Sequence, residues 1–175
     1  MNSLLKSSLA IFFTLNLTAL TVPANDVFYC QPNVPAGLWE QHPEGVVVAV
    51  IFTYPPNDPL TNTSLSVYIK NTSTTAKLFD RNDYDSGVKV FYIDASGAKV
   101  PLHDYTVPSA HLSKKLPFTI EPGTTICVRI GLNLQSYSLL KTHPVMCSFT
   151  IYDPTTKQRG LIETSPKILG KMASE

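Results

Sequence analysis

The sequence lacks the local motifs by which common enzyme classes are recognised. It contains no Gly-x-Ser-x-Gly elbow, no His-Glu-x-x-His motif, no glycine-rich phosphate loop and no Cys-x-x-Cys pair. These absences argue against a serine hydrolase of the elbow type, a zincin, a P-loop enzyme and a dithiol redox centre. We therefore expect a protein without enzymatic activity, and we assign it no catalytic residue, no bound metal and no cofactor.

An excess of charge of one sign is also missing. The chain has 14 basic and 13 acidic side chains. Because Lys6 lies in the N-terminal segment that we expect to be removed, the remaining chain is balanced. Such a balance gives neither the basic footprint of a nucleic-acid-binding protein nor an acidic tail.

Long apolar runs are scarce. One run, residues 9–20, follows the cation of Lys6 and precedes Val22-Pro23-Ala24. This pattern predicts a secretory signal peptide over residues 1–24, cleaved before Asn25. The alternative is an uncleaved anchor, but the run is shorter than the ~20 residues of a membrane span. We expect a secreted or periplasmic protein without a membrane span after cleavage.

Long helical patterns are missing too, and short alternating runs take their place. Residues 65–70 alternate strictly, with Leu65, Val67 and Ile69 on one face, and end in turn-forming residues at 71–75. Residues 46–52 are apolar on both faces, which predicts a strand covered on both sides. Further strands are expected at 76–79, 88–93, 98–102, 118–120, 124–132, 145–152 and 160–169, with a crossover of about one helical turn at 134–140.

These runs predict an all-β protein, an antiparallel β-sandwich of seven or eight strands. Residues 45–170 would form the sandwich and 171–175 a tail. The aromatic and proline-rich residues 25–44 would form an extended leader over the sandwich. Trp39 in this leader is either a platform for a ligand or an anchor that packs the leader onto the core.

A family resemblance rests on turn and packing residues between 64 and 169. The chain resembles secreted immunoglobulin-like domains of bacteria, and its layout is similar to that of BsuPI-type proteinase inhibitors. The resemblance implies an immunoglobulin-like or fibronectin-like fold and says little about function. The chain departs from the pattern at Pro144-Val145-Met146, where such domains carry glycine and an aromatic residue. The matching residues are Asn71, Thr72, Ser73, Asp94, Gly97, Lys99, Pro122, Gly123, Leu134, Tyr137, Leu139, Ser165 and Pro166.

One loop offers oxygen ligands for a binding site. Asp80, Asn82, Asp83 and Asp85 lie within six residues, as a calcium site needs, but the loop fails the EF-hand pattern because the twelfth position is Phe91. The alternative is a solvated turn. The four histidines, His42, His103, His111 and His143, fall in separate predicted loops, as zinc ligands or as solvated side chains. Asn62 and Asn71 fit the glycosylation pattern.

The three cysteines can be assigned to faces by strand parity. Cys127 is out of phase with Ile126 and Val128 and should face away from the core, whereas Cys147 is in phase with Phe149 and should face inward. In an immunoglobulin-like order the two strands also belong to different sheets. We therefore expect no bond between Cys127 and Cys147; if a disulfide forms after export, Cys30 with Cys127 is the favoured pair.

Taken together, these patterns predict an exported, non-enzymatic, immunoglobulin-like domain that binds another protein or serves as an accessory domain. Loops 80–87 and 103–115 are long enough to present a binding surface. Two alternatives stay open: a proteinase inhibitor that inserts one such loop into a protease, and a small sandwich protein that binds calcium or zinc.

Overall fold

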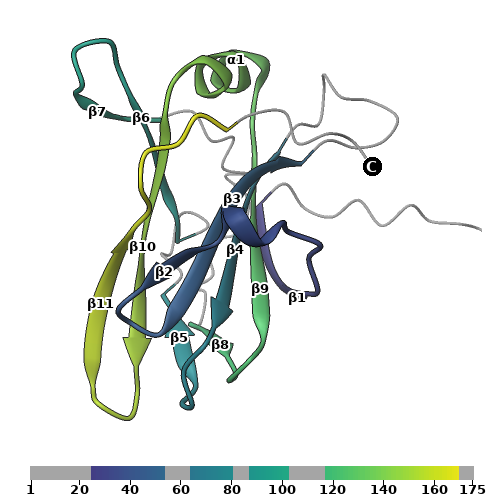
Figure 1. Cartoon of the computed structure of the whole chain (residues 1–175), viewed down its shortest axis with the longest axis vertical. Helices are drawn as coiled ribbons and strands as arrows, with labels where there is room; N and C mark the ends of the chain where they lie inside the picture. The colour runs from purple at the N-terminus through teal and green to yellow at the C-terminus, as the bar shows by residue number, and fades with distance from the viewer. Residues whose placement is uncertain (1–24, 54–63, 81–86, 103–116, 170–175) are drawn as a thin grey trace, which may run out of the picture.

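The protein is a β-sandwich of two antiparallel sheets in a computed structural model that describes residues 25–53, 64–80, 87–102 and 117–169 (Figure 1). Sheet A contains β1 (Asn25–Cys30), β2 (Glu40–His42), β3 (Val46–Thr53), β4 (Ser64–Asn71) and β9 (Thr125–Gly131). Sheet B contains β5 (Lys77–Phe79), β6 (Lys89–Ile93), β7 (Lys99–Pro101), β8 (Phe118–Ile120), β10 (Val145–Asp153) and β11 (Gln158–Glu163). The short 3-10 helix η1 (Ala36–Leu38) and the helix α1 (Leu134–Thr142) complete the described elements.

The strand order explains how the sheets are built. Sheet A has the order β1-β9-β4-β3-β2. In sheet B, β10 is central: β11 pairs with residues 148–153 of β10, and β6 and β5 pair with its first and second halves. β11 occupies one hydrogen-bonding edge of β10. β6 and β5 therefore share the other edge of β10, one after the other along its length. The outer neighbours of β5 and β6 are β8 and β7.

The expected all-β sandwich is confirmed, with eleven strands in the described residues instead of seven or eight. The main correction concerns residues 25–44, expected to form a leader over the sandwich. β1 pairs with β9 along its whole length and places Val27 in the core, while β2 pairs with β3. This segment therefore supplies both edge strands of sheet A. Its prolines lie between or after these strands, where no ladder hydrogen bond is lost.

The alternating faces agree with the sequence. Leu65, Val67 and Ile69 of β4 are fully buried between the sheets. The prediction that β3 is covered on both sides holds only in part: Val48 faces the core and Ala49 on the opposite face is buried, but Val47 and Ile51 on that outer face are half-buried. The last strand is shorter than expected, because Pro166 cannot donate to the ladder. Beyond it, a bridge joins Val145 to Lys167.

α1 closes one end of the sandwich between the two sheets, because it connects β9 of sheet A with β10 of sheet B (Figure 1). Its nine residues exceed the single turn expected. The side chain of Asn133 caps the helix by accepting a hydrogen bond from Ser136 N at 2.7 Å. Leu140 is fully buried, and the Tyr137 ring packs edge-on against the Phe52 ring, with 5.4 Å between the ring centroids.

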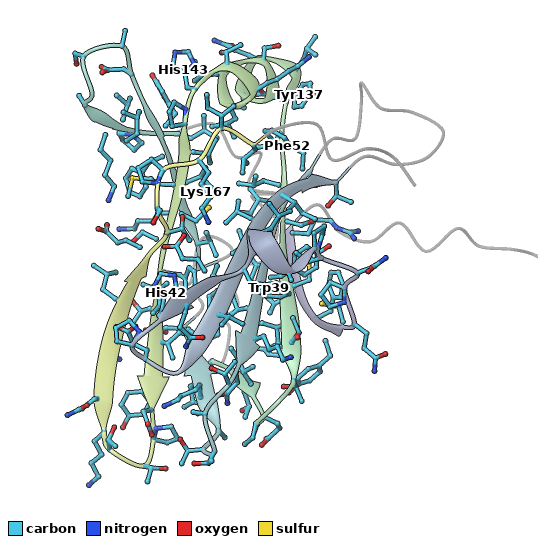
Figure 2. The ribbon with its side chains drawn as sticks, viewed as in Figure 1. Trp39, His42, Phe52, Tyr137, His143 and Lys167 are labelled. Atoms are coloured by element: carbon cyan, nitrogen blue, oxygen red, sulfur yellow. The ribbon has the colours of Figure 1, made fainter. Side chains whose placement is uncertain are left out.

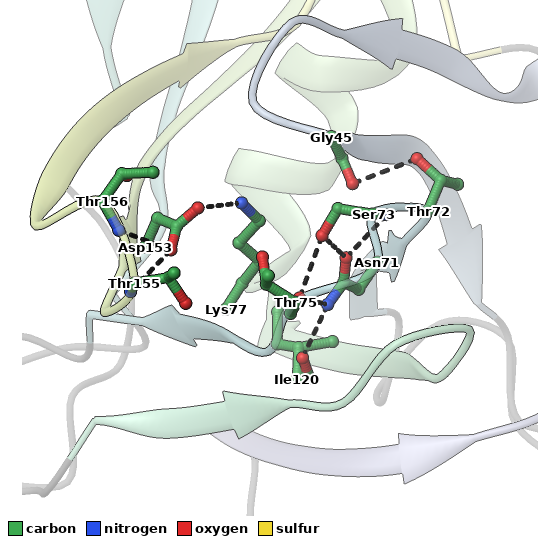
Figure 3. A network of polar contacts seen from close by, with 10 residues as sticks. All are labelled: Gly45, Asn71, Thr72, Ser73, Thr75, Lys77, Ile120, Asp153, Thr155 and Thr156. Carbon is green, nitrogen blue, oxygen red and sulfur yellow. Dashed lines mark hydrogen bonds and ion pairs between the residues drawn. The ribbon is translucent and has the colours of Figure 1, made fainter.

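The buried amide of Asn71, at the end of β4, ties the two sheets together near the opposite end (Figure 3). Its Nδ2 donates to Ile120 O of β8 and to Thr75 O, both at 2.8 Å. Its Oδ1 accepts from the backbone N and the hydroxyl of Ser73, at 3.0 and 2.7 Å. Both N–H donors and the oxygen of the Asn71 amide are therefore hydrogen-bonded inside the protein. Asn71 is therefore closed to glycosylation in the folded chain, and Asn62 lies outside the described residues.

A second polar tie joins the edge strand β2 to the segment after β11. The carboxylate of Glu40 accepts from the backbone N of Ser165 at 2.9 Å and from its hydroxyl at 3.0 Å, and it contacts Lys167 Nζ at 3.1 Å. Burial raises the pKa of Glu40, but the hydrogen bonds from Ser165 and Lys167 outweigh it and hold the pKa below its usual value. The carboxylate therefore stays ionised where it links sheet A to sheet B.

Replacing Asn71 should show how much its hydrogen bonds between the two sheets contribute to stability. In Asn71→Ala, Ile120 O loses the donor that Asn71 supplies, and Thr75 O keeps only the hydroxyl of Ser73. We therefore expect the free energy of unfolding to fall by about 2–4 kcal/mol, from ~1 kcal/mol per hydrogen bond and ~1–3 kcal/mol per buried group left unsatisfied. Urea denaturation followed by circular dichroism measures this. The exposed neighbour Thr74→Ala is the control, with a change within about 0.5 kcal/mol. Equal changes in the two variants would contradict the role of the amide.

Candidate functional site

The residues predicted to form a metal or binding loop are only partly described. Asp80 follows β5, and its Oδ2 lies 3.9 Å from Arg159 Nη2. Asn82, Asp83 and Asp85 lie outside the described residues, as do His103 and His111. His42 and His143 lie far apart, on β2 and at the end of α1 (Figure 2). Among the residues that the structure describes, no three acids, histidines or cysteines gather as metal ligands.

The strand order of sheet A creates a candidate site that the sequence did not reveal. β1 and β2 are consecutive in the chain but lie at opposite edges of the sheet. Residues 31–39, here called the strap, must therefore cross the sheet. They cross its outer face, because they share a pocket with Val47 and Lys70, which point away from the core. Of the residues 25–44 expected to form a leader, these nine are the ones that lie over the sheet.

A pocket of about 1030 Å³, here called the groove, lies between the strap and the outer face of sheet A. Trp39 lines the groove, and its Nε1 donates to Val34 O at 3.3 Å, a bond that lies within the strap and fixes its bend (Figure 2). Tyr29 is held at the edge, where its hydroxyl donates to Thr119 O at 2.6 Å. The groove is lined by Tyr29, Cys30, Gln31, Pro32, Asn33, Trp39, Val47, Lys70, Thr72, Gly123, Thr124 and Thr125.

The residues that line the groove are suited to binding a ligand. Lys70 is the one charged side chain among these twelve residues, and it is exposed. Two aromatic rings, Tyr29 and Trp39, supply apolar surface, and the remaining side chains are mostly amides and hydroxyls. An occupant with an acidic group and an apolar group would satisfy this lining. The alternation of residues 65–70 puts Lys70 on the face opposite Leu65, and Trp39 was expected to be either a ligand platform or an anchor. Nothing in the sequence placed the strap above them.

The cysteines lie on the faces that strand parity predicted. Cys127 faces outward from sheet A, whereas Cys147 lies in the core on sheet B, so the two belong to different sheets as expected. In the register of β1 and β9, Cys30 is paired with Thr125 and Phe28 with Cys127. Cys30 and Cys127 are therefore diagonal neighbours on the same face of sheet A. Diagonal neighbours are about 7–8 Å apart, beyond the ~4.4–6.8 Å between Cα atoms that a disulfide spans. The structure thus brings Cys30 and Cys127 to the same face with free thiols.

Burial makes all three thiols poor nucleophiles. It raises the pKa of Cys30 to about 11, with a further rise from the neighbouring Cys127. Burial also raises the pKa of Cys127, and that of Cys147 to about 12. Because the thiolate is the reactive form, Cys30 stays protonated at neutral pH even though it lines the groove.

A second, smaller pocket of about 330 Å³ lies between two hairpins and is here called the hairpin pocket. Lys77 Nζ donates to Asp153 Oδ2 at 2.6 Å inside it (Figure 3). The bond from Lys77 lowers the pKa of Asp153 to about 2, although burial opposes the change. Its lining is Pro43, Glu44, Lys77, Ile151, Asp153, Thr156, Gln158, Arg159 and Gly160.

Comparisons with known proteins found only distant structural likenesses. No family model and no curated protein matches it. The Northeast Structural Genomics Consortium target SoR45 is 15% identical, with a TM-score of 0.46 over 74% of this chain and 89% of that one. A functionally unknown protein from Listeria monocytogenes is 14% identical, with a TM-score of 0.38 over 82% and 88% of the two chains. A DUF4466 family protein from Parabacteroides merdae is 12% identical, with a TM-score of 0.25 over 70% and 44%.

These likenesses have TM-scores below 0.5 and say nothing of function. The sandwich architecture itself rests on the two sheets of this chain. In the described residues, no helix has the length and apolar character to cross a membrane.

The thiols should label slowly and in a fixed order. At pH 8 the thiolate fraction of Cys30 should be about a hundredfold below that of an ordinary thiol, because its pKa rises from 9.0 to about 11. Iodoacetamide labelling followed by mass spectrometry should show Cys30 reacting slowly, before Cys127 and Cys147, and all three reacting fast in urea. Rapid labelling of Cys30, or a peptide that links Cys30 to Cys127, would contradict the free and protonated state.

The ion pair between Lys77 and Asp153 should make the free energy of unfolding depend on pH below about pH 4. Asp153 has a lowered pKa, so its contribution is present above pH 3.8 and is lost as the pH falls to about 2. Asp153→Asn should destabilise the protein at pH 7, because the buried ammonium of Lys77 loses its partner. The difference from the parent in urea denaturation should shrink between pH 4 and pH 2. Glu121→Gln, in an exposed turn, is the control; a difference that stays constant with pH would refute the assignment.

Proposed function

We propose that the protein is an exported, non-enzymatic, immunoglobulin-like domain that binds a partner protein through the groove. The observation that carries the proposal is the lining, in which the rings of Tyr29 and Trp39 stand beside one ammonium, that of Lys70. Aromatic side chains anchor protein contacts because they bury much apolar surface at little entropic cost. A pocket of this size and composition favours a segment of polypeptide over a small ion.

The charge of the groove specifies the occupant further. Lys70 has no acid beside it in the lining, so a bound segment that carries Asp or Glu gains an ion pair. An apolar side chain next to that acid would pack against Trp39. The proposed occupant is therefore a short extended segment of a partner protein with an acidic residue adjacent to an apolar one.

Support for a binding role over a catalytic one comes from the thiol of Cys30. This thiol lines the groove, and burial raises its pKa to about 11, so that it is protonated at neutral pH. No base adjoins it in the lining, since histidine and carboxylates are missing there. The inhibitor and calcium alternatives rest on residues 80–87 and 103–115, which lie largely outside the described residues, and no described contact favours either.

Peptide selection tests the proposal directly. Peptides selected on the purified protein from a random library should be enriched in an acidic residue next to an apolar one. The chain has one tryptophan, Trp39, so its fluorescence reports occupancy of the groove. Binding should move the emission to shorter wavelength as the occupant displaces water. Lys70→Glu should weaken binding by about tenfold or more, the equivalent of ~1.4 kcal/mol.

The matched control is Lys89→Glu, an exposed lysine on β6 of the other sheet. It makes the same change of net charge and should leave the affinity unaltered. Peptides without a preference for acidic residues would contradict the proposal. So would equal losses of affinity in the two variants, because the effect would then be one of overall charge.

A further inference from the structure

The strand β11 has an edge along which no other described strand lies. It pairs with β10 on one side, and the sheet order gives it no neighbour on the other. Figure 1 shows β11 at the left margin of the described fold, beside β10. The edge strands β2, β7 and β8 have three residues each, and the edge strand β1 leads into the proline-rich strap. β11 has six residues and no proline, so it lacks two common protections of an edge against pairing with another chain.

The backbone groups at this free edge belong to Arg159, Leu161 and Glu163. Thr164 N, one residue beyond β11, donates to Cys147 O of β10 at 3.0 Å. Successive residues of a strand direct their N–H and C=O groups to opposite edges. Because the register of β11 on β10 is unbroken, residues 160 and 162 also point to β10, and the three odd-numbered residues point away from it. Among the described residues, no backbone group bonds to these three outward-pointing units.

The side chains of the same three residues form a self-complementary row on the outer face of sheet B. Ile162 is fully buried toward the core, so its neighbours at 161 and 163, and residue 159 in the same phase, face outward. Leu161 is 63% exposed, although it is a large apolar side chain. Two residues before it stands the cation of Arg159, and two residues after it the anion of Glu163. Reversed, this row presents an anion to its own cation and an apolar residue to its own apolar residue.

The inner face of β11 is supported by the turn between β2 and β3. A Cβ placed on Gly160 would lie 2.3 Å from Glu44 Cγ, so the missing side chain of Gly160 admits the stem of Glu44. Gly160 and Ile162 share this inner face, and Ile162 is fully buried in the core. β11 is thus held from inside, while its outer edge and outer face stay accessible.

We propose that the free edge of β11 binds β11 of a second copy of this chain, antiparallel and about a two-fold axis at Leu161. In this register Leu161 faces the partner's Leu161, and Arg159 faces the partner's Glu163. The outward N–H and C=O groups of all three residues then exchange hydrogen bonds across the axis. A shift by one residue in either direction would put Leu161 opposite a charged residue, so the self-complementary row favours one register.

The charges of the row select the register more than they add affinity. Arg159 is 71% exposed and lies 3.9 Å from Asp80, and Glu163 is 44% exposed and contacts Lys99. Exposed pairs of this kind contribute little, whereas like charges directly opposite each other are unfavourable. The backbone hydrogen bonds and the burial of Leu161 therefore supply the attraction. A contact made by one strand is small, so we expect a weak dimer.

Sedimentation velocity of the purified protein from about 10 µM to about 1 mM tests the contact, since weak interfaces have affinities in this range. The sedimentation coefficient should rise from that of a monomer toward that of a dimer. Leu161→Lys should weaken the dimer by tenfold or more, because lysine on an edge strand opposes pairing and two ammonium groups would meet at the axis. Leu134→Lys, on α1 and 61% exposed, makes the same change elsewhere and should dimerise as the parent does.

A charge exchange tests the register itself. Arg159→Glu should weaken the dimer about fivefold or more, because residue 159 then meets the partner's Glu163 with like charge. Adding Glu163→Arg to this variant restores opposite charges across the axis and should return the affinity to within about threefold of the parent. Lys89→Glu on β6 makes the same change of net charge as Arg159→Glu and should leave the dimer unaltered. Circular dichroism of each variant checks that the fold is retained.

Four results would overturn the proposal. They are a sedimentation coefficient that stays that of a monomer at every concentration, assemblies larger than a dimer, equal effects of Leu161→Lys and Leu134→Lys, and a double variant no tighter than Arg159→Glu alone. Assemblies larger than a dimer are included because a two-fold contact uses the one free edge of β11 and closes. The contact is independent of the groove, so the Lys70→Glu variant should dimerise as the parent does.

Discussion

The amide of Asn71 is the interaction on which one end of the sandwich depends. It lies at the last residue of β4, where sheet A gives way to the turn that leads to β5 of sheet B, and it holds Ile120 O of β8 at 2.8 Å. A buried polar group is stable only when every donor and acceptor is matched, and here all of them are. One side chain therefore fixes both the turn after β4 and its contact with β8.

The groove is a consequence of topology. Because β1 and β2 occupy opposite edges of sheet A, their connection has to cross the outer face, and it does so with a strap rich in proline. A strap with fixed backbone angles loses less entropy on ordering than a flexible one. The edge strand at its end is held by Glu40, which accepts from Ser165 in the segment after β11. The same contacts that close the sandwich thus hold the strap above Lys70.

Strand positions and faces could be predicted where apolar and polar residues alternate strictly along the sequence. Cys127 and Cys147 were placed on the correct faces and on different sheets, because parity survives as long as no bulge intervenes. β1 and β2 were missed, since two short strands separated by prolines have no clear alternation. The candidate site was largely missed as well: its lining comes from the strap, four strands and two turns, and no local pattern links Trp39 to Lys70.

By itself the sequence determined an all-β sandwich, the core faces of its longer strands and the absence of common catalytic motifs, because these depend on local periodicity and spacing. Tertiary structure alone decided which strands are neighbours, and with that the crossing of the strap, the groove beneath it and the meeting of Glu44 with Gly160. The reason is physical: strand order is set by burial and hydrogen bonding between segments far apart in the chain, and a pocket between such segments leaves no signature in any one of them.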